Sequence, residues 1–143
     1  MFNNYYDRHI RDVCHGVKQR DKVAVNEMAD YLLNLEMVSS RSVLVPAPQH
    51  EGFAIYTRAI ADIIAGQMKC RVADVLISSP RKPLYELKKH NVEGLLEFRL
   101  REMIHGDEIF FVDNVIDTGM TFRAADRLLG GILKPLVYAE VKI

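Results

Sequence analysis

The sequence predicts an α/β fold in which helices flank a twisted, mainly parallel sheet. Short apolar runs alternate along the chain with segments whose apolar residues recur every three to four positions, as they do in helices that cover a sheet. The length of 143 residues fits a single domain over residues 1–143. Hydrophobic residues make up 49% and charged residues 27%, a composition typical of globular chains and not of disordered ones.

The first half of the chain alternates helix, strand, helix and strand. Residues 1–38 are predicted to be helical because apolar residues fall on one face at helical spacing: Val25, Met28, Ala29, Leu32 and Leu35. The apolar run Ser42–Val45, closed by Pro46, predicts a buried strand that ends in a loop. A second helix is predicted over residues 54–68, and Ala73–Ile77 is a candidate for the second strand.

The middle of the chain contains a basic loop. Ser79–Asn91 has two prolines and more lysine and arginine than acidic residues, which predicts a loop of local positive charge. Leu95–Leu100 predicts a short strand after this loop, and Glu108–Val112 predicts the central strand of the sheet.

The last part of the chain predicts a loop, a helix and a closing strand. Asp113–Thr121 is expected to be a compact loop. The following helix is expected to turn Phe122, Ala125, Leu128 and Leu129 inward and to end at the pair Gly130 and Gly131. Leu136–Val141 is the predicted last strand. Ligands in such sheets bind beyond the carboxyl ends of the strands, so those loops are the candidate sites.

Charge and cysteine content exclude several classes of function. The 19 basic and 19 acidic residues cancel, so there is no overall attraction to nucleic acid or to an anionic membrane. No apolar run approaches the roughly 18 residues of a membrane span, and we expect no secretory signal at the amino terminus. Two distant cysteines, Cys14 and Cys70, fit a reducing compartment. We therefore expect a cytoplasmic protein.

The segment Phe110–Phe122, FFVDNVIDTGMTF, has the chemistry of an anion-binding loop. Gly119 can adopt positive φ, and the hydroxyls of Thr118 and Thr121 can donate hydrogen bonds. The following helix presents unpaired N–H groups and the positive end of its dipole. Asp113, at the strand end, suits sugar hydroxyls or a hydrated metal ion. A plain turn with a helix cap at Asp117 or Thr118 is the alternative for this segment.

The complete string resembles the phosphoribosyl pyrophosphate (PRPP) binding motif of type I phosphoribosyltransferases. That resemblance implies the family's fold and a PRPP-binding set of residues: Asp113, Asn114, Asp117, Thr118, Gly119, Met120 and Thr121. Asp117 and the residues Thr118–Thr121 would hold the 5′-phosphate. Asp113 would contact the ribose hydroxyls, together with Mg²⁺ in some members. The sequence I-D-T-G is most similar to that of 6-oxopurine phosphoribosyltransferases, in which the acid at the Asp117 position is a proposed general base.

The motif departs from the family pattern at two positions. Asn114 stands where the family has its second acid, so one negative charge is missing near the reacting sugar. Met120 is bulkier than the glycine or alanine that the family often has there. These differences affect the expected catalytic power more than the expected binding of PRPP.

Two further loops match the family in position. The loop after the first central strand is similar to the pyrophosphate loop, with a weaker likeness to ComF-like proteins, which makes candidates of Ala47, Pro48, Gln49 and His50. Backbone N–H groups of Gln49–Gly52 would meet pyrophosphate there; an ordinary Pro-rich turn is the alternative. The basic loop corresponds to the family's flexible catalytic loop, with Arg81, Lys82, Lys88 and Lys89 as pyrophosphate ligands; the alternative is a solvated basic hairpin.

The resemblance implies a Mg²⁺-dependent transfer of phosphoribose from PRPP to a nitrogenous base, such as a purine, with release of pyrophosphate. The expected partners are these small molecules and a second copy of the chain in a homodimer, and residues 1–38 are candidates for the base-binding hood or the dimer contact. A catalytically inactive domain that senses PRPP or a nucleotide is the main alternative. A receiver-type domain with Asp113 as phosphoacceptor is disfavoured because Val43–Pro46 contains no acid.

Overall fold

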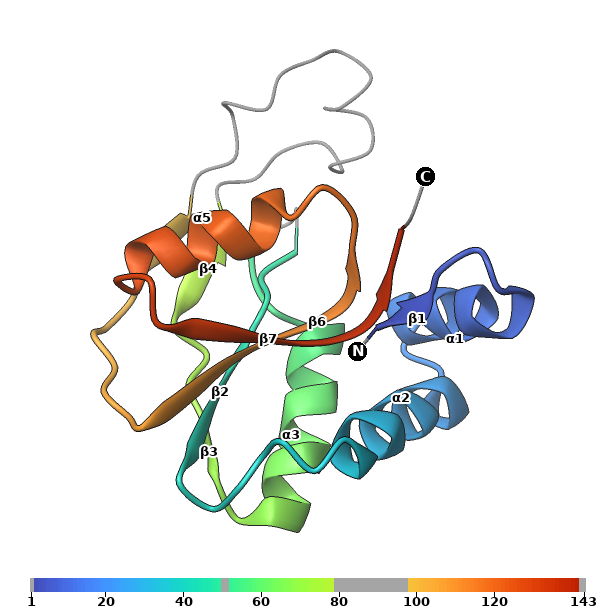
Figure 1. Ribbon diagram of the computed structural model, residues 1–143, viewed down its shortest axis with the longest axis horizontal. Coiled ribbons are helices and arrows are strands. Elements are labelled where there is room, and N and C mark those ends of the chain that lie inside the picture. Colours follow the sequence, from blue (N-terminus) through green and yellow to red (C-terminus); the bar gives the residue numbers. More distant parts are fainter. Residues whose placement is uncertain (1, 50–51, 79–97, 142–143) are drawn as a thin grey trace.

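The computed structural model describes residues 2–49, 52–78 and 98–141 (Figure 1). Their secondary structure consists, in chain order, of β1 (Asn3–Asn4), α1 (Arg8–Lys18), α2 (Lys22–Asn34), β2 (Ser42–Pro46), α3 (Tyr56–Met68), β3 (Arg71–Val72), β4 (Leu76–Ser78), β5 (Phe98–Leu100), β6 (Glu108–Ile116), α5 (Met120–Leu128) and β7 (Leu133–Glu140).

The predicted α/β class with a mainly parallel sheet is confirmed. The main sheet has five strands in the order β1-β7-β6-β2-β3, and each neighbouring pair in it runs parallel. β4 and β5 form a separate antiparallel pair beside this sheet. The longest strands, β6 and β7, lie at its centre and carry the sheet's twist (Figure 1).

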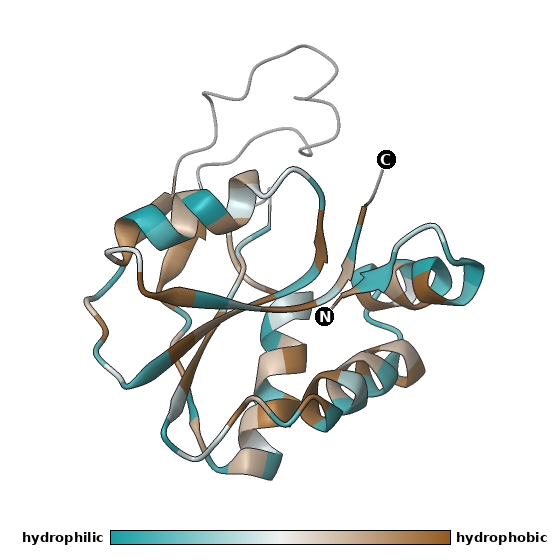
Figure 2. Ribbon diagram, in the orientation of Figure 1, coloured by the Kyte–Doolittle hydropathy of each residue, from teal (hydrophilic) through white to brown (hydrophobic). Residues whose placement is uncertain are grey.

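Two helical layers cover the two faces of the sheet. On one face, Phe110 and Val112 of β6 pack with α1, α2 and α3, while Ile109 and Phe111 pack on the other face with Ala125 of α5. This alternation follows from the two-residue period of a strand. Figure 2 shows the result: the central strands are mostly hydrophobic, whereas α1 and α5 also carry hydrophilic stretches.

The amino-terminal segment forms two helices instead of one. Asp7 begins α1, where its carboxylate accepts the N–H of Ile10 at 3.1 Å, and Asp21 begins α2 in the same way with the N–H of Ala24 at 3.2 Å. Gly16 lets the two helices approach closely, because a Cβ there would lie 2.7 Å from the Cβ of Ala24. These helices cover the sheet as a unit.

Several sequence-based boundaries were wrong. In the strand expected over Ala73–Ile77, residues 73–75 belong to no strand: β3 ends before them and pairs with β2 in the main sheet, whereas β4 begins at Leu76 and pairs with β5 outside it. β7 begins at Leu133, earlier than expected, because it follows β6 from Ile109 onward. Leu128 points outward on α5 and is 39% exposed. In the part of the chain that the structure describes, none of the helices has the length and apolar character that crossing a membrane requires.

Candidate functional site

The carboxyl end of β6 differs from the sequence-based expectation. β2 ends at Pro46, which is paired with Val112, but β6 continues to Ile116 beside β7. Asp113 therefore lies inside the strand, opposite Val137, and not in the loop after it. This extension occurs because Val115 and Ile116 still find partners on β7, at Ala139 and Glu140. Asp113 is still at the carboxyl edge of the sheet, since it comes directly after the last residue paired with β2.

The chain turns from β6 into α5 through Asp117–Gly119. Gly119 adopts a left-handed conformation with φ of 84° and is the N-cap residue of α5. The Thr118 hydroxyl accepts the N–H of Met120 at 3.3 Å. The cap is thus Gly119, and neither Asp117 nor Thr118 occupies that position as the plain-turn alternative proposed. Since Gly119 has no side chain, the guanidinium of Arg123 can approach it closely: a Cβ at Gly119 would lie 2.7 Å from Nη1 of Arg123.

A pocket of about 50 Å³ lies between the end of β6 and the start of α5. This volume is enough for several water molecules or a small anionic group. Most of its wall comes from the motif found in the sequence: Phe111, Asp113, Val115, Ile116, Asp117, Thr118, Gly119, Met120, Thr121 and Phe122, with Val137 from β7. The structure thus brings together six of the seven residues that the resemblance implies for PRPP.

Asp113 supplies this pocket with a carboxyl group that is a weaker acid than an ordinary aspartate. Burial raises the pKa of Asp113 to about 7, while the hydrogen bond from the N–H of Asn114 to its Oδ1, at 2.8 Å, and the positive charge of Lys18 act in the opposite direction. Near neutral pH this group is therefore partly protonated. It can accept a hydrogen bond from a sugar hydroxyl as the carboxylate and donate one as the acid.

Asn114 is the predicted ligand residue that does not line the pocket. Its side chain is buried, with 3% of the residue exposed, and its Oδ1 accepts the N–H of Val115 at 2.9 Å. Within the described residues its Nδ2 is buried with no hydrogen-bond partner. A buried amide donor thus occupies the position at which the resemblance implies a second acid.

In the loop between β2 and α3, backbone N–H groups are paired with carbonyl groups of the chain. The N–H of Ala47 donates to the carbonyl of Val112 on β6 at 2.9 Å. The N–H of Gln49 donates to the carbonyl of Phe53, and the N–H of Gly52 donates to the carbonyl of Gln49, both also at 2.9 Å. Ala47 and Pro48 are buried. In this conformation the N–H groups of Gln49 and Gly52 are already paired, and the pyrophosphate role of this loop stays a prediction. His50 lies outside the described residues.

The side chain of Gln49 has a structural role. Its Oε1 accepts the N–H groups of Ile55 and Tyr56, both at 3.0 Å, at the start of α3. Residue Ile55, at the N-cap of that helix, makes no side-chain capping bond. Gln49 thus satisfies donors that the helix end would otherwise leave unpaired.

The basic segment predicted to close over the site joins β4 to β5. Arg81, Lys82, Lys88 and Lys89 lie outside the described residues, but the two ends of the connection are fixed by the pairing of Ser78 with Phe98. The N–H of Ser78 donates to the carbonyl of Gly52 at 2.9 Å. The start of this connection is therefore attached to the loop between β2 and α3.

Two basic residues near the pocket were missed by sequence reasoning. Arg123 folds back over the loop, and its Nη1 donates to the Thr118 carbonyl at 2.9 Å. Its position four residues after Gly119 on a helix is a signal that could have identified it. Lys18, at the end of α1, lies close enough to Asp113 to lower the pKa of that acid. Sequence spacing gives no hint of this charge effect, which depends on how α1 packs against the sheet.

The pocket wall contains two carboxylate residues, Asp113 and Asp117. No group of three or more His, Cys, Asp or Glu side chains that could hold a metal is found in residues 2–49, 52–78 and 98–141. Mg²⁺ requires oxygen ligands, usually one or two carboxylates. The Mg²⁺ ligand role of Asp113 stays a prediction of the resemblance.

No family model matches the chain, and no curated protein matches it. The resemblance to phosphoribosyltransferases therefore depends on the motif Phe110–Phe122 and on the other loops named above.

Proposed function

We propose that this protein is a type I phosphoribosyltransferase-like enzyme. It binds PRPP and transfers phosphoribose to a nitrogenous base, possible acceptors including purines, with release of pyrophosphate. The observation that carries this proposal is the pocket at the end of β6, since it is lined by the residues of the PRPP-like motif from Asp113 to Thr121.

The parts of the pocket suit the parts of PRPP. The left-handed Gly119 and the hydroxyls of Thr118 and Thr121 fit a phosphate group at the start of α5. Asp113 fits the ribose hydroxyls because it lies deeper in the pocket, on the strand, and can both accept and donate hydrogen bonds. Arg123 adds positive charge next to the phosphate position.

The reaction exchanges one bond at C1 of the ribose. The bond from C1 to the pyrophosphate oxygen breaks, a bond from C1 to a nitrogen of the base forms, and the proton of that nitrogen leaves. Asp117, exposed at the pocket wall, is the proposed acceptor of that proton. Water must be excluded because hydrolysis of PRPP competes with transfer. The basic residues Arg81, Lys82, Lys88 and Lys89 are proposed to meet the leaving pyrophosphate.

The surroundings of the site complete the proposal. Residues 2–18, which contain β1 and α1, are the proposed hood over the base, since α1 packs close to Asp113. A homodimer is the proposed assembly. We place the activity in the cytoplasm, which agrees with two cysteines that form no disulfide.

Calorimetric titration with PRPP tests the proposed binding, with ribose 5-phosphate and inorganic phosphate as matched ligands that lack pyrophosphate. We expect micromolar affinity for PRPP and weaker binding of both controls. A panel of purine and pyrimidine bases, assayed for pyrophosphate release, then tests transfer. Absence of PRPP binding would remove the proposal.

One observation favours the alternative of a PRPP-sensing domain without transferase activity. Asn114 replaces an acid near the reacting sugar and is buried, so less negative charge is available to stabilise a cationic transition state. Such a domain would bind PRPP with the same residues but would release no pyrophosphate with any base. The two assays above therefore distinguish the enzyme from the sensor.

A further inference from the structure

We propose that the turn between β1 and α1 carries the subsite for the nitrogenous base, where Tyr6 stacks on the base and Tyr5 lies beside it. This inference rests on the proposed function and deepens it, because it names the residues that receive the acceptor. Both tyrosines lie outside the wall of the pocket at β6 and α5. The arguments for the subsite are the hydrogen bonds, the strand pairing and the ring geometry of this turn.

Three hydrogen bonds fix the backbone of the turn. The N–H of Tyr5 donates to the carbonyl of Glu140 on β7 at 2.9 Å, and the N–H of Tyr6 donates to Oδ1 of Asn4 at 2.9 Å. The N–H of Asp7, the N-cap of α1, donates to the carbonyl of Asn4 at 3.1 Å. The two tyrosines are therefore held in place before a ligand arrives, so that less conformational freedom is lost on binding.

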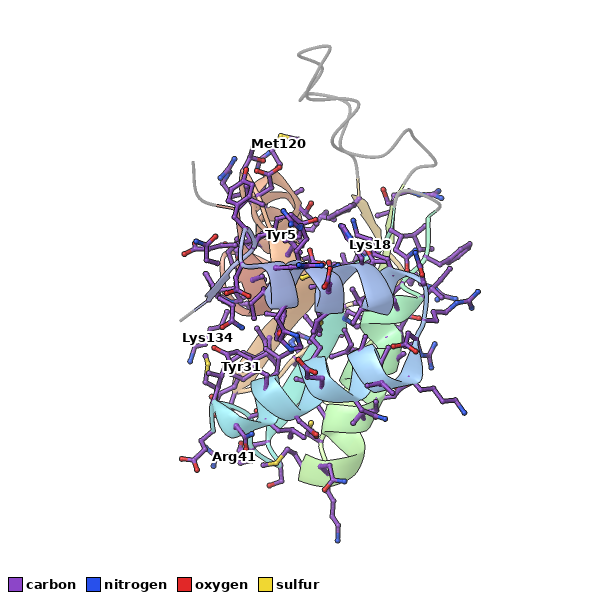
Figure 3. All side chains as sticks on the ribbon, turned by 90° about the vertical axis from the view of Figure 1, so that its right-hand side faces the viewer. Tyr5, Lys18, Tyr31, Arg41, Met120 and Lys134 are labelled. Carbon is purple, nitrogen blue, oxygen red and sulfur yellow. The ribbon has the colours of Figure 1, made fainter. Side chains whose placement is uncertain are left out.

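Strand pairing brings this turn to the same edge of the sheet as the pocket. Glu140, whose carbonyl accepts the N–H of Tyr5, is paired with Ile116 of the pocket wall. Tyr5 thus lies two strand spacings from Ile116, a separation of about 10 Å. That separation is comparable to the length of a ribose with its base, so a ligand whose phosphate lies in the pocket can reach the turn. In the view of Figure 3, Tyr5 lies on the side of α1 toward Met120, another residue of the pocket wall.

The two tyrosine rings form a corner that suits a planar ligand. Their centroids are 6.1 Å apart and their planes meet at 70°. The Tyr5 hydroxyl shares a hydrogen bond of 3.0 Å with Nε2 of His15, which fixes the orientation of the Tyr5 ring. Aromatic side chains bind nucleic acid bases by stacking, and every base has a face that can stack. The corner therefore recognises a planar nitrogenous base as a class.

A second tyrosine pair shows what a purely structural pair looks like in this fold. Tyr31 of α2 and Tyr138 of β7 also contact edge to face, with centroids 5.2 Å apart, but Tyr138 is buried in the core and Tyr31 is half-buried against it. Tyr5 likewise packs against that core. Tyr6 instead keeps 53% of its surface exposed. Its ring is thus available to a ligand.

Titration calorimetry of the full chain with AMP, GMP, UMP and ribose 5-phosphate tests this inference. The nucleotides share the phosphate and the ribose with ribose 5-phosphate and add a base at C1, so the ratio of affinities measures what the base contributes. We expect at least one nucleotide to bind the wild type about tenfold more tightly than ribose 5-phosphate, which is the gain from one stacking contact. Tyr6→Ala should bring this ratio close to one. Tyr6→Phe is the matched control, because it keeps the ring and should keep the ratio.

PRPP provides the reference that separates this inference from the proposed function, because it carries no base. Equal affinities of the wild type for the nucleotides and for ribose 5-phosphate, with PRPP still bound, overturn the inference alone. The same ratio in Tyr6→Ala and Tyr6→Phe also overturns it; if Tyr6→Ala then changes the sedimentation of the protein, Tyr6 is a contact between copies of the chain. No binding of PRPP removes the proposed function, and the inference with it.

Proton NMR of the tyrosine rings in the wild type is an independent test that needs no loss of stability to be considered. A nucleotide should shift the ring signals of Tyr6, which Tyr6→Phe identifies by their disappearance, and ribose 5-phosphate should leave them in place. The ring signals of Tyr31, which contacts Tyr138 at the core, should not move with either ligand. A nucleotide that binds without shifting the Tyr6 signals would contradict the base subsite.

Discussion

Two loops at the same edge of the sheet, from β2 to α3 and from β6 to α5, differ in how their polar groups are used. The loop from β2 to α3 uses the N–H groups of Ala47, Gln49 and Gly52 within the chain, and the Gln49 side chain caps α3. The turn from β6 to α5 has a glycine at the N-cap and lines a pocket. A loop whose donors are already paired stabilises the fold, whereas one with accessible donors can bind a ligand. This contrast places the candidate site at β6 and α5.

The largest effect on PRPP affinity is expected for Gly119→Ala. The φ of 84° disfavours any residue with a Cβ, and the new Cβ would lie 2.7 Å from Nη1 of Arg123. We expect PRPP affinity to fall by about a hundredfold and stability to fall by about 1–2 kcal/mol. The control is Gly66→Ala on α3, where nothing lies within 4 Å of the new Cβ; it should leave affinity unchanged. Equal effects of both changes on affinity would contradict the site.

Asp113→Asn should change how stability depends on pH. The folded-state pKa of Asp113 is raised to about 7 from an ordinary value near 4, so the native state holds a proton that the unfolded state releases. Wild-type stability should therefore fall as the pH rises from about 4 to about 7, by a contribution on the order of 2 kcal/mol. The variant should lack this part of the slope.

Urea denaturation at several pH values measures that slope. Asp30→Asn, on α2, removes an exposed carboxylate and serves as the control for a general change of charge. If the unfolding free energies of wild type and Asp113→Asn depend on pH in the same way, the carboxyl group of Asp113 is not the cause of the slope.

Gln49→Leu tests the structural role of the closed loop. Removing Oε1 leaves the N–H groups of Ile55 and Tyr56 without their acceptor, and we expect a loss of about 1 kcal/mol in unfolding free energy. Gln49→Glu keeps an acceptor and should lose less. Chemical denaturation measures both. A stable Gln49→Leu with much weaker PRPP binding would instead make Gln49 a ligand residue, as the family resemblance implied.

The smallest effect on PRPP binding is expected for Arg123→Gln. The guanidinium contacts the Thr118 carbonyl and is exposed, so its loss should weaken PRPP binding by about fivefold and more strongly at low salt. Arg127→Gln is the matched control, since Arg127 is exposed at the other end of α5. If both variants bind alike at every salt concentration, Arg123 adds nothing specific to the site.

Local patterns were sufficient to predict much of the fold. The helical spacing of Val25, Met28 and Leu32 identified the face of α2 that is buried, and the apolar run before Asp113 identified the central strand. The motif itself identified the pocket wall, because a strand, a glycine turn and a helix start are all determined by neighbouring residues.

Features that depend on distant partners were not predictable in this way. The polar pair Asp113 and Asn114 looked like the start of a loop, but pairing with β7 carries the strand on to Ile116. The effect of Lys18 on the pKa of Asp113 depends on the packing of α1 on the sheet, and the closed loop at Gln49 depends on hydrogen bonds to groups several residues away. Each is a consequence of tertiary structure, which overrides local propensity.

The most direct test of the site is an NMR titration of ¹⁵N-labelled protein with PRPP. The amide signals of Thr118, Gly119, Met120 and Thr121 should shift most, because these residues line the pocket at the proposed phosphate position. The internally bonded amides of Ala47, Gln49 and Gly52 should shift less. Largest shifts at Ala47, Gln49 and Gly52, or none in the segment from β6 to α5, would contradict the assignment of the PRPP site.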